Sequence, residues 1–265
     1  MEKFKWDADD YSNFSSEQQK WGRELISKLN LKEDDEVLDI GCGEGKITAE
    51  ISLKVKKGNV KGIDNSGPMI QLAKQKFPAE EYQNLSFEVC DAREIYFHDR
   101  FSVVFSNAAL HWVDDHAKVL EGIYKSLKPG GRILLQFGGE GNASAAFLIL
   151  DEIINDEKWS KYFQNFKFPY NFPGDIEYSD LITKSGLTLK RVQLVEKDMV
   201  HEGEAGFAGW IRTTWLPYTS KVPENEREEF ISRNVKRYVE KFKKDLNGNI
   251  HIKMVRLEAE AVKRN

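Results

Sequence analysis

Three closely spaced glycines follow an apolar segment and an acid in the run Val37-Leu-Asp39-Ile-Gly41-Cys-Gly43-Glu-Gly45. An apolar strand that ends in glycines and opens into a helix leaves backbone N–H groups exposed, so a nucleotide-like cofactor can approach the main chain closely. The dinucleotide fingerprint Gly-x-Gly-x-x-Gly would need glycine at position 46, where the chain has Lys46. The spacing therefore favours a cofactor that has a ribose but no phosphates, and it argues against NAD.

Two acids further along the chain could bind such a cofactor, because each follows an apolar segment. Asp64 could accept hydrogen bonds from both ribose hydroxyls, or it could be the N-cap of the helix that begins near Pro68. Asp91 could accept a hydrogen bond from an adenine amine while the backbone N–H of Ala92 reaches a ring nitrogen, or it could lie in a surface turn. Together with the glycines, these acids make S-adenosylmethionine (SAM) the leading candidate.

The segment Ser106-Asn-Ala-Ala-Leu-His-Trp112 follows a fourth apolar run. Ligands of open α/β sheets bind at the carboxyl ends of the strands, so we expect Asn107 and Ala108 to lie near the methionine part of the cofactor. His111 could act as a general base for a hydroxyl or carbon acceptor. A carboxylate acceptor is already ionised and needs no base, and His111 would then have a packing or hydrogen-bonding role.

Apolar runs alternate with amphipathic segments in the first half of the chain, which is typical of a parallel sheet buried on both faces. Strands are expected at 36–40, 59–63, 85–89, 101–105 and 132–137. Helices are expected at 16–29, 46–54, 68–76 and 116–127, the last of them stopped by Pro129-Gly-Gly131.

The pattern changes after Gly138. Helices are expected at 143–159, 178–185, 203–219 and 224–246, with an aromatic loop at 163–173 and two alternating segments, 187–197 and 250–262, that could pair antiparallel. We therefore expect a doubly wound α/β fold with a Rossmann-like, seven-stranded, mostly parallel sheet and a helical lid. In this division, residues 1–30 form a helical segment over the cofactor, 31–141 the SAM-binding core, and 142–265 the lid inserts with the last two strands.

Composition excludes several functional classes. The chain has 265 residues, 40% of them hydrophobic, and a net charge of −4, so a general nucleic-acid binder is not expected. No run approaches the roughly 18 apolar residues of a membrane span, and the first residues lack the apolar part of a signal peptide. Cys42 and Cys90 have no Cys-x-x-Cys partner, so neither a disulfide framework nor a metal site is expected. We predict a cytoplasmic protein, a monomer or homodimer, that interacts with a small molecule and with no membrane.

Four motifs together resemble the class I SAM-dependent methyltransferases. They are Asp39-Ile-Gly41-Cys-Gly43-Glu-Gly45, Gly62-Ile-Asp64-Asn65-Ser-Gly-Pro-Met69, Cys90-Asp91-Ala92 and Leu127-Lys-Pro-Gly-Gly131. The resemblance implies that Asp39, Gly41 and Gly43 lie at the methionyl and ribose end of SAM. It also implies that Asp64, with Asn65 beside it, binds the ribose. Met69 would pack on the adenine, and Asp91 with Ala92 would read the adenine edge.

A narrower resemblance covers most of the chain. The segments Trp6-Asp-Ala-Asp-Asp-Tyr11-Ser-Asn-Phe-Ser15, Asn107-Ala-Ala-Leu-His-Trp112 and Gly209-Trp-Ile-Arg212 resemble the trans-aconitate methyltransferases, and the juvenile-hormone-acid methyltransferases share the His-Trp motif. The resemblance implies carboxyl O-methylation of a small organic acid, with the segment around Tyr11 closing over the cofactor. Aconitate-type enzymes often have glutamine at position 111 and an arginine within 215–218, whereas this chain has His111 and no arginine there.

Four residues are candidates for substrate binding: Trp112, Arg212, Trp215 and Arg256. A guanidinium can hold a carboxylate through two parallel hydrogen bonds, although single arginines are often structural or solvated. The aromatic residues of 163–172 could line a pocket or belong to a core. Two other functions stay open: methyl transfer to a hydroxyl, a carbon or a carrier-bound acyl group, and a non-catalytic SAM-binding module.

Overall fold

The computed structural model describes residues 16–264, so Tyr11 and the rest of the segment 1–15 lie outside the described residues. The internal contacts divide the chain into two compact units. The sheet unit comprises Gln18–Glu140, Tyr170–Val195 and Arg256–Asn265. The helical unit includes Gly141–Pro169 and Glu196–Val255.

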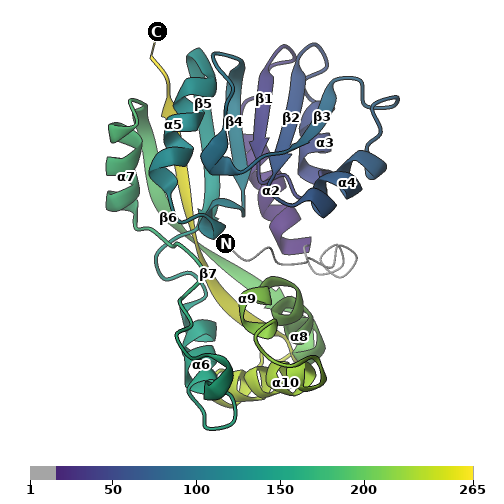
Figure 1. Cartoon of the computed structure of the whole chain (residues 1–265), viewed down its shortest axis with the longest axis vertical. Helices are drawn as coiled ribbons and strands as arrows, with labels where there is room; N and C mark the ends of the chain where they lie inside the picture. Colours follow the sequence, from purple (N-terminus) through teal and green to yellow (C-terminus); the bar gives the residue numbers. More distant parts are fainter. Residues whose placement is uncertain (1–15, 265) are drawn as a thin grey trace. The chain divides into compact units, whose positions relative to one another are not determined.

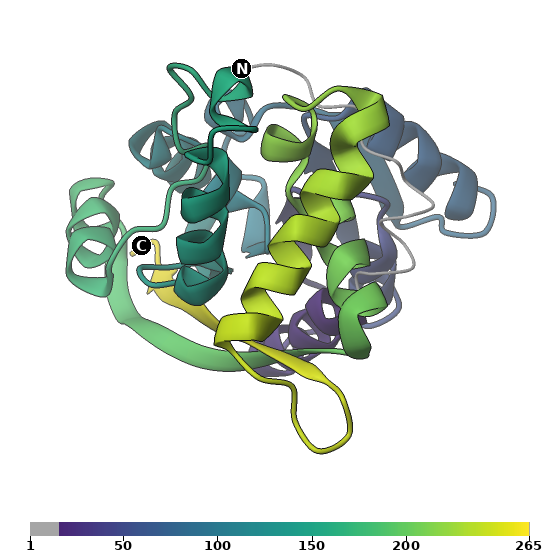
Figure 2. The ribbon, with the colours of Figure 1, turned by 90° about the horizontal axis from the view of Figure 1, so that it is seen from below.

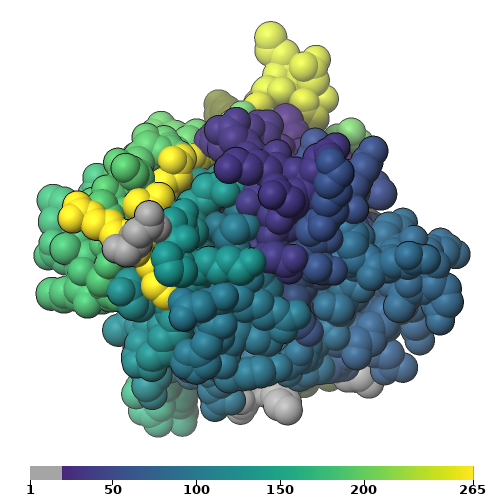
Figure 3. Space-filling model, turned by 90° about the horizontal axis from the view of Figure 1, so that it is seen from above, coloured from purple at the N-terminus to yellow at the C-terminus, as the bar shows by residue number. Residues whose placement is uncertain are grey.

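The sheet has seven strands in the order β3-β2-β1-β4-β5-β7-β6 (Figure 1). The strands are β1 (Glu36–Ile40), β2 (Asn59–Asp64), β3 (Leu85–Val89), β4 (Phe101–Asn107), β5 (Leu127–Gly138), β6 (Thr188–His201) and β7 (Ile250–Val262). Strands β1 to β5 pair in parallel, whereas β7 runs antiparallel to β5 and places Arg256 opposite Gly138. Figure 3 shows the surface from above, where the colours pass from green through yellow and teal to purple and blue. The doubly wound α/β fold is thereby confirmed.

Helices cover both faces of this sheet because each inner strand is apolar on both sides. Helices α2 (Ser16–Lys28), α3 (Lys46–Ser52) and α4 (Gly67–Lys76) lie on one face, and α5 (His116–Ser126) and α7 (Asp175–Lys184) lie on the other. In β1, Val37 packs on the first face while Leu38 and Ile40 pack on the second. This alternation follows from the period of two residues in a strand.

The helical unit contains α6 (Ser144–Ile154), α8 (Gly203–Thr214), α9 (Leu216–Thr219) and α10 (Glu224–Lys241). Helices α6 and α10 run side by side, as Figure 2 shows. The prediction of one helix over 203–219 is wrong at Trp215, where the chain leaves helical geometry two residues before Pro217. Helices α6 and α10 also end earlier than predicted. No helix in the described part of the chain has the length and hydropathy that a membrane crossing requires.

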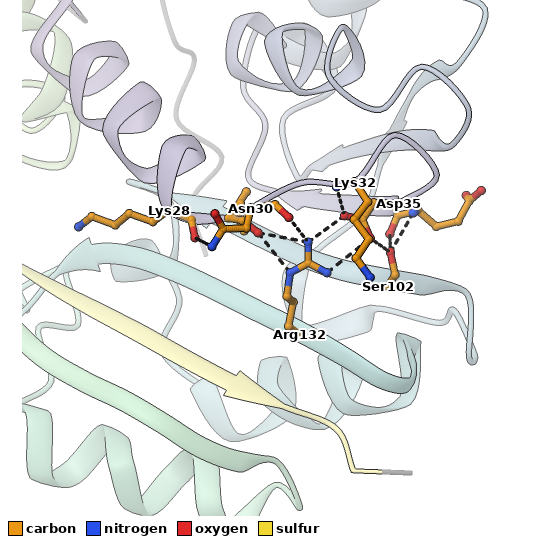
Figure 4. A network of polar contacts seen from close by, with 8 residues as sticks. Lys28, Asn30, Lys32, Asp35, Ser102 and Arg132 are labelled. Carbon is orange, nitrogen blue, oxygen red and sulfur yellow. Dashed lines mark hydrogen bonds and ion pairs between the residues drawn. The ribbon is translucent and has the colours of Figure 1, made fainter.

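A buried carboxylate joins the amino-terminal ends of the central strands (Figure 4). Asp35 precedes β1 and accepts hydrogen bonds from the Arg132 guanidinium of β5 (2.8 Å), from the Ser102 hydroxyl of β4 (2.7 Å) and from the backbone N–H of Lys32 (2.8 Å). Arg132 also donates to the carbonyl oxygen of Leu29, at the end of α2. Burial alone would raise the pKa of Asp35, but these hydrogen bonds outweigh burial and the pKa is lowered.

We expect Arg132→Met to lower the free energy of unfolding by about 3 kcal/mol at pH 7, because it leaves the buried Asp35 carboxylate without its cation. A lowered pKa stabilises the fold above the pKa of the unfolded state, and this stabilisation is lost as the pH falls through the folded-state pKa. The difference between variant and wild type should therefore shrink in acid. Urea denaturation at pH 7 and at about pH 3, below the unfolded-state pKa of an aspartate, measures both effects.

Arg23→Met is the matched control, since the Arg23 and Glu50 side chains form an exposed ion pair and should contribute less than about 1 kcal/mol. Equal losses in the two variants would contradict the structural role of the Asp35 network.

Candidate functional site

The glycine loop lies where the strand order reverses, between β1 and β4. Gly41 has a φ of +73°, and a Cβ atom there would lie 2.1 Å from Cβ of Ala109. The Ser106 hydroxyl donates a 2.8 Å hydrogen bond to the carbonyl oxygen of Ile40. The loop after β1 and the loop after β4 are therefore in direct contact, and only glycine fits at position 41.

Asp64 anchors the other side of the glycine loop. Its Oδ2 accepts from the backbone N–H of Gly43 (3.0 Å), and its Oδ1 accepts from that of Ser66 (2.9 Å). Ser66, and not Asp64, caps helix α4, because its hydroxyl accepts from the backbone N–H of Met69. Each carboxylate oxygen of Asp64 keeps a second lone pair for a ligand. A Cβ on Gly43 would meet no atom within 4 Å, so the space beside this loop is open.

Asp39 is the second carboxylate at this end of the sheet. It is 2% exposed and accepts a 2.7 Å hydrogen bond from the Thr48 hydroxyl of α3. Burial raises its pKa to about 7, the Thr48 hydrogen bond opposes this rise, and the charge of Asp64 adds to it. Burial also raises the pKa of Asp64. Two neighbouring carboxyl groups that resist ionisation are suited to a cationic ligand, which would favour their charged forms.

The strand end after β3 holds Asp91 in the N-cap position of a short 3-10 helix, η1 (Ala92–Glu94). Asp91 accepts from the backbone N–H of Arg93 (2.9 Å) and from the Arg93 guanidinium, which lowers its pKa. Met69 is buried on α4, whereas Asn65 is exposed beside Asp64. The segment Cys90-Asp91-Ala92 thus forms a local turn in which hydrogen bonds hold the Asp91 carboxylate.

The chain after β4 turns sharply into a second 3-10 helix, η2 (Leu110–Trp112). Asn107 pairs with Gln136 of β5, and Ala108 has a φ of +56° while its N–H donates to the Gln136 carbonyl oxygen (2.7 Å). His111 accepts a long hydrogen bond of 3.5 Å at Nδ1 from the N–H of Gly138. The ends of β4 and β5 thereby place the His111 ring.

Aromatic rings from a distant segment gather at His111. Tyr170 and Phe172 stack on each other with centroids 5.5 Å apart, and their centroids lie 6.1 and 6.0 Å from that of His111. Trp112 meets Tyr170 edge-on at 4.8 Å. The backbone N–H of Asn171 donates to the His111 carbonyl oxygen (2.8 Å), which holds this segment against η2. The aromatic run is evident from the sequence, but the contact of Tyr170 and Phe172 with His111 is not.

Arg256 supplies a positive charge near His111. Its side chain is 3% exposed on β7, and its guanidinium lies 5.6 Å from the ring centroid of Trp21 on α2, in a cation–π contact. Burial and, next to it, the charge of Arg256 hold the pKa of His111 well below its usual range. His111 is therefore a neutral imidazole at physiological pH.

The other two candidates for substrate binding belong to the helical unit. The Arg212 guanidinium donates two hydrogen bonds to the Glu228 carboxylate, of 2.8 and 2.6 Å. Trp215 is 2% exposed and stacks on Phe147 with centroids 5.5 Å apart. Phe163 of the aromatic run also packs in this unit, against Phe230. Among the described residues, no group of three or more His, Cys, Asp or Glu side chains is arranged to hold a metal.

The model of the methyltransferase-domain family matches residues 31–173, which contain the glycine loop and all three acids. The chain belongs to the methyltransferase family. This methyltransferase is 30% identical to an uncharacterised methyltransferase of Schizosaccharomyces pombe over 72% of its own length and 74% of that protein. It is 25% identical to a trans-aconitate 2-methyltransferase of Rhizobium rhizogenes over 98% of its length and 99% of that enzyme.

Solved structures agree with this assignment at the level of the fold. A structure of phosphoethanolamine N-methyltransferase 2 from Haemonchus contortus in complex with S-adenosyl-L-methionine aligns with a TM-score of 0.61 and 19% identity. The alignment covers 97% of this methyltransferase and 57% of that chain. The protein is a SAM-dependent methyltransferase, and the residues present fit its cofactor, since Asp64 keeps lone pairs for hydroxyl donors and the face of Gly43 is open.

Asp39→Asn should stabilise this methyltransferase at high pH. A raised folded-state pKa contributes stability below the unfolded-state pKa, and this contribution is lost as the pH rises through about 7. The ionised carboxylate then costs the fold roughly 2–4 kcal/mol, a cost that asparagine avoids. Thermal unfolding at pH 8.5 should show a higher Tm for the variant, with little difference at about pH 4, close to the unfolded-state pKa of an aspartate. A variant that is less stable at both pH values would contradict this account of Asp39.

Proposed function

We propose that the enzyme transfers the methyl group of SAM to the carboxylate of a small organic acid. The observation that carries this proposal is the buried guanidinium of Arg256 beside the neutral ring of His111, at the carboxyl ends of β4 and β5. Such a site offers a positive charge to an anion but only a weak base. A carboxylate acceptor needs the positive charge but no base, because it is already ionised.

In this proposal the cofactor lies along the carboxyl ends of β1, β2 and β3. Asp64 accepts from the ribose hydroxyls, and Asp39 with the glycine loop faces the cationic methionyl end. Asp91 and the N–H of Ala92 read the adenine edge, over Met69. The remaining contacts that we assign to the cofactor come from Gly41, Gly43, Asn65, Asn107, Ala108 and, outside the described residues, Tyr11.

SAM supplies an electrophilic methyl group on a sulfonium ion, so the protein has to place the acceptor and exclude water. Arg256 would orient a carboxylate through its planar fork, with the indole of Trp21 fixing the guanidinium from one side. Trp112, with Tyr170 and Phe172 around His111, would contact the apolar body of the acid. His111 would act by packing and hydrogen bonding.

Two further candidates for substrate binding, Arg212 and Trp215, lie in the helical unit. Arg212 donates to the Glu228 carboxylate through Nε and Nη2. We assign the acid first to Arg256, because its charge lies near His111. Trp215 belongs to a ring cluster of the helical unit and would bind substrate only if that cluster lines the acceptor site. We propose that the helical unit is the lid and that residues 1–30 cover the cofactor. The similarity to trans-aconitate 2-methyltransferases, at about a quarter identity, supports an acid as acceptor.

Asp64→Ala should weaken SAM binding tenfold or more, because it removes charge-assisted hydrogen bonds to the ribose and the anchor of the Gly43 N–H. Isothermal titration with SAM and with S-adenosylhomocysteine gives both dissociation constants. Glu88→Gln is the control and should bind like the wild type, because this partly buried acid on β3 pairs with Lys61. An unchanged dissociation constant for Asp64→Ala would refute the ribose assignment.

A methyl-transfer assay over small mono-, di- and tricarboxylic acids tests the acceptor, with alcohols and phenols as the comparison set. We expect turnover on acids, a rise in KM of tenfold or more in Arg256→Gln, and a loss below about tenfold in kcat for His111→Ala. A loss above roughly a thousandfold in His111→Ala, with SAM binding intact, would instead identify His111 as a general base and favour a hydroxyl or carbon acceptor. Tight SAM binding without turnover on any class would favour a non-catalytic module.

A further inference from the structure

One side chain determines the orientation of the Asp91 carboxylate. Nε of Arg93 donates to Oδ1 of Asp91 (3.0 Å), and Nη2 donates to Oδ2 (2.7 Å), so the guanidinium and the carboxylate are joined by two parallel hydrogen bonds. The backbone N–H of Arg93 adds a third hydrogen bond to Oδ1 (2.9 Å). Both side chains are about a quarter exposed, which leaves the pair only partly screened by water.

These contacts leave one specific position for a further donor. Oδ1 accepts two hydrogen bonds, which uses both of its lone pairs, while Oδ2 accepts one and keeps one. The planar fork of Arg93 also fixes the plane of the carboxylate, and hence the direction of that remaining lone pair. Without the fork, the carboxylate of Asp91 would be held only through its bond to the backbone N–H.

Arg93 also reaches toward the acceptor side of the sheet unit. Its Nη1 donates a 2.9 Å hydrogen bond to Oδ1 of Asp114, in the turn that follows η2. Asp114 is 71% exposed, so this third interaction contributes little to stability. It nonetheless places the guanidinium between the end of β3 and the turn that follows η2, the 3-10 helix that contains His111 and Trp112.

We propose that Arg93 is a positioning residue for adenine recognition: its fork holds Asp91 so that one lone pair of Oδ2 stays available to the 6-amino group of SAM. The proposal rests on the proposed function, because Asp91 has to read the adenine edge. Arg93 itself touches no cofactor in this scheme. Its effect is specific to the amino group, because it acts only through the carboxylate that accepts from it.

The probes are S-adenosylhomocysteine and S-inosylhomocysteine, which has a 6-oxo group in place of the amine. In the wild type the ionised Asp91 accepts from the amine but repels the carbonyl oxygen, so the first should bind much more tightly. In Arg93→Lys and Arg93→Met the carboxylate can rotate, which should weaken S-adenosylhomocysteine binding by roughly three- to tenfold. Binding of the inosyl compound should stay the same or improve. Lysine should not rescue, because a point charge cannot fix the carboxylate plane.

Asp114→Asn is the matched control, since it removes the third hydrogen bond of the same guanidinium and leaves the fork on Asp91. It should change neither dissociation constant by more than twofold. General damage to the site would weaken both ligands equally and leave their ratio unchanged, and thermal unfolding of each variant shows whether it is folded. If Arg93 has only a structural role, its loss will leave the ratio of the two dissociation constants unchanged. A change in this ratio is therefore the evidence for positioning.

An unchanged ratio in Arg93→Lys and Arg93→Met would overturn the proposal, as would tighter binding of S-adenosylhomocysteine, which would show that Arg93 competes with adenine for Asp91. Asp91→Ala distinguishes the positioning role of Arg93 from the assignment of Asp91 to adenine. If Asp91→Ala removes the discrimination and the Arg93 variants do not, only the role of Arg93 fails. If Asp91→Ala or the wild type shows no effect of the amino group, the adenine assignment itself is wrong.

Discussion

Parallel pairing of β1 with β2 on one side and β4 on the other is the constraint on which the site depends. It brings the carboxyl ends of these strands to one edge, where the loops after β1 and β4 meet at the point where the order reverses. Gly41 then has to pass within contact of Ala109, and Asp64 can reach the N–H of Gly43. Asp39, Asp64 and Asn107 owe their positions to this pairing.

The opposite edge of the same strands is built for stability, and the two edges use carboxylates in opposite ways. Asp35 is buried with a cation and two further donors, so its pKa is lowered and its charge stabilises the fold. Asp39 is equally buried and accepts a hydrogen bond from the Thr48 hydroxyl, with no cation among its partners in the described part of the chain; burial therefore raises its pKa to about 7. Residues that bind a cationic ligand leave part of their charge unsatisfied in the free protein, and the stability lost there is offset by pairs such as Asp35 with Arg132.

The strands, the glycine loop and the order of the elements follow from local signals: apolar runs of strand length, a glycine where φ is positive, and an acid at a strand end. Other features depend on contacts between distant residues. Arg256 lies near His111 because β7 runs antiparallel to β5 in a register that sets Arg256 opposite Gly138. No periodicity in the sequence fixes that register. The aromatic run 163–172 is also divided between two units, since Phe163 packs in the helical unit and Tyr170 against η2.

The charge of Arg256 affects the protonation of His111, and an acid bound to Arg256 would also affect it. Burial and, next to it, the charge of the guanidinium lower the pKa of His111, so the imidazole stays neutral and is a poor acid or base. A carboxylate bound to Arg256 would compensate that charge, and by linkage it would raise the pKa of His111. Protonation of His111 would then favour retention of the acid, whereas loss of the carboxylate charge on methylation would remove this attraction. In the reaction that we propose, the same pair would hold an anionic acceptor and would release a neutral ester.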